Sequence, residues 1–437
     1  MACAPEPAVE ISQSPPPRVE HGGATHRLSL WIGAILLYEG FTMSINGIGA
    51  PWIAKSFHLG ESGIAGLFAW ISLSAIGALA LSRMIDRMGR RRMLLLCIAG
   101  TPVCALAAAL STNLVAFAAS NIALYAFIGA TISSCIVLLA EELEASERAR
   151  GQSIGGLGLA LGAGGSLILM PVLAAHGYSW RWLLVLASAE GVLAWRAAAR
   201  VIPESERWER AASAGLTSAS SFYDVFGPLY RRRSVPILIC WMLTTIAAVS
   251  ANSWSYFHAV SVAGLSPGAA SAMMILGGGL GLLGFPLGAM GCERFGRVPT
   301  IVVSGLLVGL GALAFYWGPP KHFALPILWL GAANCWFVAA QSALQVGGNS
   351  AGTELFPTAI RGAMMGWYAM GGAVGSVCAQ AIIAILAARM GGLSIVVGYL
   401  SLLAIPSALI FWIYIPETRG LSLEAAALEE AFEKSSP

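Results

Sequence analysis

Two glutamates lie deep inside apolar segments, where a carboxyl group needs either a partner or a function. Glu39 stands in the stretch AILLYEGFTMSING, residues 34–47, eleven residues after Leu28. At the rise of an α-helix it would lie about 16 Å into an apolar membrane core about 30 Å thick. Glu190 is similarly deep in a later segment. Desolvation at that depth favours the neutral carboxyl group, so both residues are candidates for reversible proton binding.

A second group of residues offers polar and aromatic side chains of the kind that hold small ligands in mostly apolar pockets. These substrate-binding candidates are Asn46, Asn121, Tyr125, Asn252, Trp254, Tyr256, Asn334, Trp336 and Gln341. For any one of them, ordinary helix packing or a place in an interfacial aromatic belt is an equally good interpretation. His258, close to Tyr256 in sequence, is interpreted as an interfacial residue.

The composition indicates which elements must position these residues. The 437 residues are 57% hydrophobic and only 11% charged, whereas soluble domains carry about 25% charged residues. Apolar runs of about 20 residues recur, each long enough to cross a bilayer as a helix. No alternating pattern supports a β-barrel. We therefore expect an all-α polytopic membrane protein.

Twelve apolar runs can be placed along the chain. They cover residues 28–53, 64–83, 93–111, 114–140, 152–173, 181–199, 234–260, 267–291, 298–317, 323–347, 362–387 and 391–415. The charged insertion 200–233 divides them six and six. This predicts two six-helix bundles, 28–199 and 234–415, joined by a cytoplasmic linker and flanked by cytoplasmic tails, 1–27 and 416–437. The first tail is Pro-rich, without the apolar core and cleavage site of a signal peptide, and is expected to be disordered.

The positive charges predict the orientation of the spans. With both termini in the cytoplasm, 21 of the 25 Lys and Arg residues fall in cytoplasmic segments. Only Lys55, Arg181, Lys321 and Arg389 fall outside. Since cytoplasmic loops of membrane proteins are rich in Lys and Arg, we expect a multi-pass protein of the plasma membrane, the inner membrane of a bacterial cell.

The two halves of the chain repeat one another. The loop after the second span reads SRMIDRMGRRRM and the loop after the eighth reads GCERFGRVPT; both contain acid–Arg–x–Gly–Arg. The loop EELEASERARG after the fourth span corresponds to ELFPTAIRG after the tenth. Two parallel repeats are a transporter architecture, in which the substrate binds near the midplane between the halves.

These motifs resemble those of the major facilitator superfamily, and more narrowly its branch of sugar porters and of metabolite and aromatic-acid proton symporters. DRMGRRR (86–92) is similar to the signature loop of the superfamily. PESERW (203–208), ELFPTAIRG (354–362) and PETRGLSLE (416–424) resemble three further motifs of that branch. The stretch EGFTMSINGIGAPWIAKSF resembles the first span of the aromatic-acid symporters. The resemblance covers residues 28 to 425 and implies the major facilitator fold, twelve transmembrane helices in two six-helix bundles.

The resemblance also implies which deep acid is the better proton site. In that fold spans 1, 4, 7 and 10 line the cavity and span 6 lies outside it, so Glu39 is favoured for proton binding and Glu190 for a structural role. Thr42 and Tyr125 stand where proton-coupled relatives keep a second acid and an arginine as the protonation pair. Either Glu39 acts alone or this site does not couple transport to protons. The sugar-binding signatures of spans 7 and 10 are missing too.

The resemblance further implies a gate at the cytoplasmic side that holds one side shut while the other is open. Its predicted members are Asp86, Arg87, Arg90, Arg150, Glu204, Glu293, Arg297, Glu354, Arg361 and Glu417. The acids at the start of the repeated loops would cap adjoining helices, and the arginines would bind carboxylates and helix carbonyls. Arg91 and Arg92 are interpreted instead as topology signals.

We therefore expect a secondary active transporter that moves a small organic metabolite by alternating access, with protons as a candidate coupling ion. An aromatic or organic acid or a sugar-like solute fits the resemblance. No Lys or Arg lies at the depth of Glu39, which by itself favours a neutral or cationic solute. The alternative is a proton-driven efflux pump for drugs or natural products, which would use the same fold. A non-transporting sensor would usually add a long soluble tail.

Enzymatic readings of two motifs fail on their context. GQSIG (151–155) fits a nucleophile elbow and GLGLLG (279–284) fits a dinucleotide fingerprint, but both fall at or in predicted membrane helices. Glycines four residues apart, Gly277 and Gly281 or Gly284 and Gly288, allow close helix packing there. No Walker A motif or CxxC metal spacing occurs. We expect no enzyme, no cofactor or metal, no nucleic-acid partner, and a monomer in the lipid bilayer.

Overall fold

The computed structural model describes residues 22–142, 145–202, 204, 223–318, 326–356 and 358–419, and all regular structure in these ranges is helical. The first half contains α1 (Gly22–Ser56), α2 (Glu61–Ser72), α3 (Ser74–Met88), α4 (Arg90–Leu110), α5 (Leu114–Glu142), α6 (Ala145–Ala175) and α7 (Arg181–Val201). The second half contains η1 (Asp224–Phe226), α9 (Arg231–Phe257), η2 (His258–Val262), α10 (Pro267–Gly281), α11 (Gly284–Arg294), α12 (Arg297–Tyr316), α13 (Pro326–Glu354), α14 (Thr358–Met390), α15 (Leu393–Ser401) and α16 (Ala404–Tyr414).

Twelve spans in the described part of the chain are long and apolar enough to cross a membrane. They match the twelve predicted runs to within a few residues at most ends, which confirms the all-α polytopic fold class. The predicted linker, 200–233, and both predicted tails lie largely outside the described residues.

Three of the described spans consist of two α-helices separated by a break. The second breaks at Leu73 between α2 and α3, the eighth at Leu282 and Leu283 between α10 and α11, and the twelfth at Leu402 and Leu403 between α15 and α16. The second and eighth spans are equivalent in the six-plus-six repeat, so the break itself is repeated. It lets the two parts of one span contact different neighbours.

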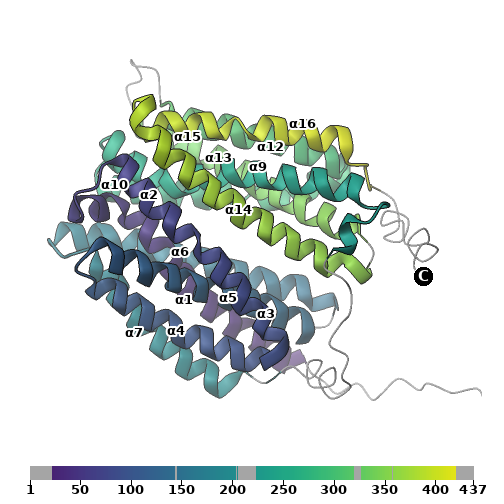
Figure 1. The fold of residues 1–437 in the computed structure, drawn as a ribbon, viewed down its shortest axis with the longest axis horizontal. Coiled ribbons are helices and arrows are strands. Elements are labelled where there is room, and N and C mark those ends of the chain that lie inside the picture. Colours follow the sequence, from purple (N-terminus) through teal and green to yellow (C-terminus); the bar gives the residue numbers. More distant parts are fainter. Residues whose placement is uncertain are drawn as a thin grey trace, which may run out of the picture.

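Figure 1 shows the first seven helices as one bundle and the helices from α9 onward as a second bundle beside it. In the first bundle, α1 and α6 make the most extensive contact. Their backbones touch, because a Cβ on Gly162 would overlap the carbonyl oxygen of Leu37, and one on Gly158 that of Gly33. Small residues at such positions let helices approach closely in a membrane.

Glycines have the same function in the second bundle. Gly277 and Gly281 on α10, and Gly284 and Gly288 on α11, all lie against α13. A Cβ on Gly288 would lie 2.6 Å from the Cα of Ala343. The close packing predicted for these four glycines is confirmed, and the GLGLLG stretch is an interrupted helix rather than a nucleotide-binding loop.

The two bundles contact each other at one end. We call the end where α1 begins and α16 stops the terminal end, and the opposite one the far end. The cross-bundle pairs are α2 with α14, α6 with α10, and α1 with α9, whereas α3 makes little contact with α14. Because α2 is the far-end part of its span and α3 the terminal-end part, the bundles are closed together at the far end.

Aromatic side chains and one carboxylate form this far-end closure. Phe68 of α2 stacks on Trp254 of α9 with ring centroids 4.9 Å apart. Trp52 of α1 lies 6.4 Å from Tyr256. The carboxylate of Glu61, at the start of α2, accepts a 2.5 Å hydrogen bond from the backbone N–H of Leu393, the first residue of α15.

Candidate functional site

Glu39 is enclosed within the first bundle. Its side chain is 0% exposed and neither carboxyl oxygen has a hydrogen-bond partner. The hydroxyl of Thr131 on α5 lies close enough to interact and also lacks a hydrogen bond in the described residues. The thiols of Cys97 on α4 and Cys135 on α5 face the same site. An unpaired carboxyl group in such a place is stable only in its neutral form.

Thr42 and Tyr125 stand where the resemblance implies a protonation pair in proton-coupled relatives. In this protein both side chains bind backbone carbonyl groups. The hydroxyl of Thr42 donates to the carbonyl of Tyr38 at 2.9 Å, and that of Tyr125 donates to the carbonyl of Met43 at 2.6 Å. Both hydrogen bonds therefore fix the α1 backbone around Glu39. No charged group of the described residues compensates its carboxyl.

Asn46 and Asn121 join α1 to α5 beside Tyr125. The amide of Asn46 donates to Oδ1 of Asn121 at 2.8 Å, and the amide of Asn121 donates to the carbonyl of Phe117. Both side chains are buried, and Oδ1 of Asn46 accepts no hydrogen bond from the described residues. These three candidates thus form one polar cluster with a spare acceptor.

Asn252 and Gln341 form a second polar pair, in the other bundle. Nδ2 of Asn252 on α9 donates to Oε1 of Gln341 on α13 at 2.8 Å. Nδ2 of Asn252 also donates to the carbonyl of Ala248 at 3.0 Å, and since the side chain is exposed, its Oδ1 is accessible as an acceptor.

The other four substrate-binding candidates lie elsewhere. Trp254 and Tyr256 belong to the far-end closure through their ring contacts with Phe68 and Trp52. Within the second bundle, Trp254 donates to Gln380 at 3.0 Å and Tyr256 contacts Ser271 at 3.3 Å. Asn334 packs against Gly277. Trp336 is exposed and, five residues before Gln341, points about 140° away from it around α13.

Glu190 is not enclosed as Glu39 is, although it lies close enough to Tyr38 of α1 to interact with it. Its side chain is exposed on α7, beside the exposed Val192 and Leu193. That surface faces lipid in an inserted protein, not the other bundle. This arrangement does not favour a proton site on the transport path.

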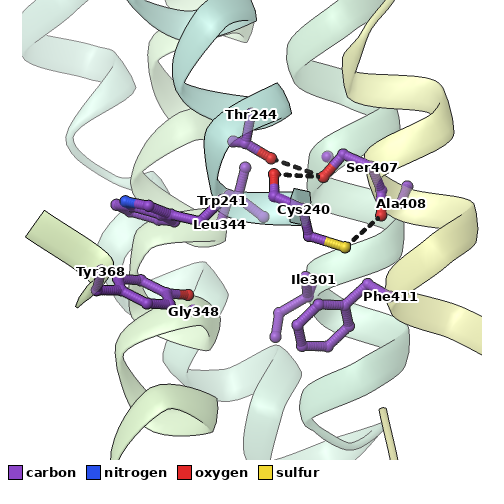
Figure 2. Close-up of a pocket in the computed structure, with 11 residues that line it drawn as sticks. Cys240, Trp241, Thr244, Ile301, Leu344, Gly348, Tyr368, Ser407, Ala408 and Phe411 are labelled. Carbon is purple, nitrogen blue, oxygen red and sulfur yellow. Dashed lines mark hydrogen bonds between the residues drawn. The ribbon is translucent and has the colours of Figure 1, made fainter. Parts of the chain in front are cut away.

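Figure 2 shows a recess in the second bundle that the sequence did not predict. It encloses about 20 Å³ between α9, α12, α13, α14 and α16. The rings of Trp241 and Tyr368 stack at its side, 4.3 Å apart and inclined by 26°. On its other side, the hydroxyls of Thr244 and Ser407 lie 2.8 Å apart, and Ser407 also donates to the carbonyl of Cys240. No motif marks these residues, since each is an ordinary core residue in sequence.

His258 lies near the end of the seventh span, in the π-helical turn η2, and only 4% of the residue is exposed. Nδ1 of His258 lies 2.7 Å from the hydroxyl of Ser394, the residue after Leu393. The histidine therefore supports the helix end that Glu61 holds.

Comparison with known proteins decides the family. The family model described as "Major Facilitator Superfamily" matches residues 30–377, well over half of the chain. The chain belongs to the major facilitator superfamily. The resemblance read from its motifs is confirmed, and the family is one of transporters rather than enzymes.

Two curated relatives of this superfamily member are similar over much of their length. A gentisate transporter of Corynebacterium glutamicum is 22% identical over 360 residues, which are 81% of this chain and 79% of the relative. A 3-(3-hydroxy-phenyl)propionate transporter of Escherichia coli is 25% identical over 301 residues, 66% of this chain and 72% of the relative.

Among solved structures, the E. coli xylose transporter XylE in a partially occluded inward-open conformation has the same fold. The TM-score is 0.72 at 17% identity, over 92% of this chain and 100% of the other. This likeness confirms the major facilitator fold with its two bundles.

At the terminal end of this major facilitator protein, two glutamates cap equivalent helices. Glu204 accepts from the backbone N–H of Arg91 at 2.8 Å, where α4 begins. Glu417 accepts from the N–H groups of Arg297 and Val298 at 2.9 and 3.0 Å, where α12 begins. Each capped helix follows a glycine with positive φ, 100° at Gly89 and 109° at Gly296. Carboxylates are favourable at helix N-termini.

Both caps join helices of the same bundle. The guanidinium of Arg91 further binds the carbonyls of Ile202 and Ala199 at the end of α7, at 2.7 and 2.8 Å. Arg91 is therefore a structural cap as well as a topology charge. These contacts tie α4 to α7 and α12 to the segment after α16, and do not bridge the bundles.

The hydrogen bonds by which Glu417 caps α12 change the pKa of its carboxyl group. Partial burial acts to raise the pKa of Glu417, but the backbone N–H groups of Arg297, Arg419, Val298 and Thr418 outweigh it, so its pKa lies below the usual range. The charged form is the one that caps α12.

The remaining gate residues are less defined. Glu293 has an exposed side chain, and the capping role predicted for it belongs to Glu417. Arg90 and Arg297 both make contacts. Asp86, Arg87, Arg150, Glu354 and Arg361 lie on described helices, but their side chains lie outside the described part of the chain.

Proposed function

We propose that this protein imports a small aromatic acid together with a proton, by alternating access across the plasma membrane. The observation that carries the proposal is Glu39, a fully buried carboxyl group at mid-depth with no hydrogen-bond partner. Such a group can take up or release a proton only when its surroundings change, as they do when two bundles rock against each other.

The substrate class rests on the relatives. Gentisate and 3-(3-hydroxyphenyl)propionate are both aromatic carboxylic acids with ring hydroxyl groups, and the transporters named for them match most of the chain. They favour an aromatic acid over the drugs or natural products of the efflux alternative.

The charge distribution supports a role for the proton. No Lys or Arg of the described spans lies at the depth of Glu39, so nothing there neutralises a substrate carboxylate. A carboxylate at the bilayer centre without a counter-charge is costly. With one proton on Glu39, the loaded site holds one negative charge, that of the substrate, instead of two, and the acid and proton together cross the membrane as a neutral cargo.

The remaining features belong to the same proposal. The Lys and Arg asymmetry supports cytoplasmic termini, which makes the far end the outer end. The two polar pairs, Asn46 with Asn121 and Asn252 with Gln341, are the proposed substrate contacts on either bundle. We propose a monomer that binds lipid, substrate and protons. The charged residues predicted for the gate would close the terminal end when the far end opens.

Uptake into proteoliposomes tests the proposal. Purified protein should accumulate radiolabelled 3-hydroxybenzoate when the outside is made acidic. Glu39→Gln should lose this accumulation but keep exchange of labelled for unlabelled substrate, since exchange needs no net proton movement.

Glu190→Gln is the matched control, because it removes a carboxyl group of equal depth from the lipid-facing surface. It should keep both activities. Accumulation that persists in Glu39→Gln would exclude Glu39 as the proton site, and absence of all aromatic-acid transport by the unmodified protein would exclude the substrate class.

A further inference from the structure

The outer surface of the first bundle carries a groove between α4 and α7. The groove encloses about 600 Å³, a volume typical of sites that hold small ligands. Neither helix makes an extensive contact with the second bundle, and Figure 1 shows both on the side of the first bundle away from it. In an inserted protein the groove therefore opens to lipid and not to the transport path.

The lining of the groove is almost entirely apolar. The hydroxyl of the buried Ser188 on α7 donates to the carbonyl of Pro102 on α4 at 2.9 Å, so its hydrogen is already used. The other polar side-chain group of the lining is the indole N–H of Trp195. The exposed walls are hydrophobic side chains: Val103, Leu106, Leu110, Val192 and Trp195. Such a lining suits a hydrocarbon chain better than the carboxylate of an aromatic acid.

The groove has the length of one leaflet of a bilayer. On α4 it runs from Ala99 to Leu110, eleven residues or about 16 Å at the rise of an α-helix. Since α4 ends at Leu110, at the far end, this stretch extends from the far end to about mid-depth. Half of an apolar core about 30 Å thick is about 15 Å. The groove therefore matches one extended acyl chain of a lipid in the far-end leaflet.

A positive charge lies beside the far end of the groove. Arg181, the first residue of α7, donates from Nη1 to the carbonyl of Ala109 at 2.8 Å, one residue before Leu110 of the lining. Its other side-chain hydrogen bonds also start from Nη1, and its guanidinium lies over the rings of Phe57 and Trp180. Within the described residues, Nε and Nη2 of Arg181 donate no hydrogen bond and no carboxylate pairs with the charge.

These free N–H groups fit the head group of a phospholipid. A guanidinium stays charged and binds phosphate oxygens through parallel N–H donors. A zwitterionic lipid carries its own ammonium group, which already compensates its phosphate. An anionic lipid brings one uncompensated negative charge, which matches the unpaired charge of Arg181.

We propose that the groove between α4 and α7 is a binding site for one anionic phospholipid of the far-end leaflet, with its phosphate on Arg181 and one acyl chain between the two helices. The inference goes beyond the proposed function, since it depends neither on the substrate nor on proton coupling.

Photo-crosslinking inside the groove tests the proposal. Leu106, an exposed residue of the lining, is replaced by p-benzoylphenylalanine, which on illumination bonds to a neighbouring acyl chain. The full-length protein is placed in vesicles of equal phosphatidylglycerol and phosphatidylcholine with identical acyl chains, and mass spectrometry counts the two adducts. Phosphatidylglycerol adducts should be in about 5-fold excess, the preference that one cation near the membrane surface gives.

Two controls separate a site from ordinary contact with bulk lipid. The same probe at Leu193, exposed on α7 outside the lining, should give equal adducts. Arg181→Gln should reduce the excess at Leu106 to none, whereas Arg181→Lys should keep most of it. Arg389→Gln removes an exposed cation from the far end of the second bundle and should leave the excess unchanged.

Three results would overturn the proposal. Equal adducts at Leu106 with Arg181 intact, or the same excess at Leu193, would mean that bulk lipid covers the groove; neither result depends on whether the Arg181 variants fold. An excess that persists in folded Arg181→Gln would show that another group binds the phosphate. Because no transport is measured, failure of the proposed function would leave each of these results unchanged.

Discussion

At the scale of the residue, the two deep glutamates show how environment separates similar side chains. Glu39 is sealed among Thr131, Cys97 and Cys135, whereas Glu190 opens onto the outer surface of α7. Sequence gives both the same depth, because hydropathy reports position along a helix and not the direction in which a side chain points. The contrast predicts different consequences of substitution.

Glu190→Leu should stabilise the protein and leave transport intact. An acidic side chain on a lipid-facing surface opposes insertion, and its replacement by leucine should gain about 1–2 kcal/mol. Thermal unfolding of the purified protein in lipid nanodiscs measures this as a rise in the midpoint temperature. Leu193→Glu, on the same exposed face, should lower it. A fall in stability or transport for Glu190→Leu would show that the carboxyl group has a functional partner.

At the scale of the element, the helices were largely predictable and their contacts were not. Twelve apolar runs predict twelve spans because length and hydropathy are local properties. The breaks at Leu73, between two serines, and at Leu282, in a glycine-rich stretch, fall within spans that stay apolar on average, so mean hydropathy does not detect them. Likewise, Trp336 and Gln341 share a span, yet only Gln341 meets Asn252. Trp241 and Tyr368 were missed because packing alone distinguishes them.

Gly162→Ala should destabilise the α1–α6 contact strongly. Its new Cβ would overlap the carbonyl oxygen of Leu37, which is backbone and cannot move away alone. Overpacking of this kind costs about 1–3 kcal/mol or more. The measurement is folded yield and thermal midpoint against Gly164→Ala, whose Cβ would meet nothing within 4 Å. Equal behaviour of the two variants would contradict the close approach of these helices.

The cap on α12 should make stability depend on pH. The folded pKa of Glu417 is lowered, so its stabilising contribution is present above the ordinary carboxyl range and is lost as pH falls through the folded pKa. Glu417→Gln should therefore cost about 1 kcal/mol at pH 7 and progressively less towards pH 4 and below. Thermal unfolding at several pH values measures the difference between the two proteins.

Glu293→Gln controls for loss of a carboxyl group at the same end, because the Glu293 side chain is exposed. It should change stability little at any pH. A Glu417→Gln deficit that is constant from pH 7 to pH 3 would contradict the charged cap.

At the scale of the whole molecule, the bundles are held together by few groups. The described contacts between them gather at the far end, in the aromatic pairs and in Glu61 with Leu393. The last pair joins residues 332 positions apart, and neither lies in a motif. The motifs instead predict contacts at the terminal end. There, the described cap of Glu204 lies within the first bundle and that of Glu417 lies within the second. The described parts of the motifs thus join helices within each bundle, and they do not form the contact that closes the far end.

Glu61→Ala should shift the protein towards states open at the far end. It removes a charge-assisted hydrogen bond between the bundles, worth about 1–2 kcal/mol, and so should change the ratio of states about 5- to 30-fold. Spin labels at Met88 and Phe295, both exposed at the terminal end, should move closer together by double electron–electron resonance in a cysteine-free background. Lys55→Ala, which removes an exposed charge at the far end, should leave the distances unchanged. Identical distance distributions for Glu61→Ala and the parent protein would mean that the aromatic pairs alone keep the far end closed.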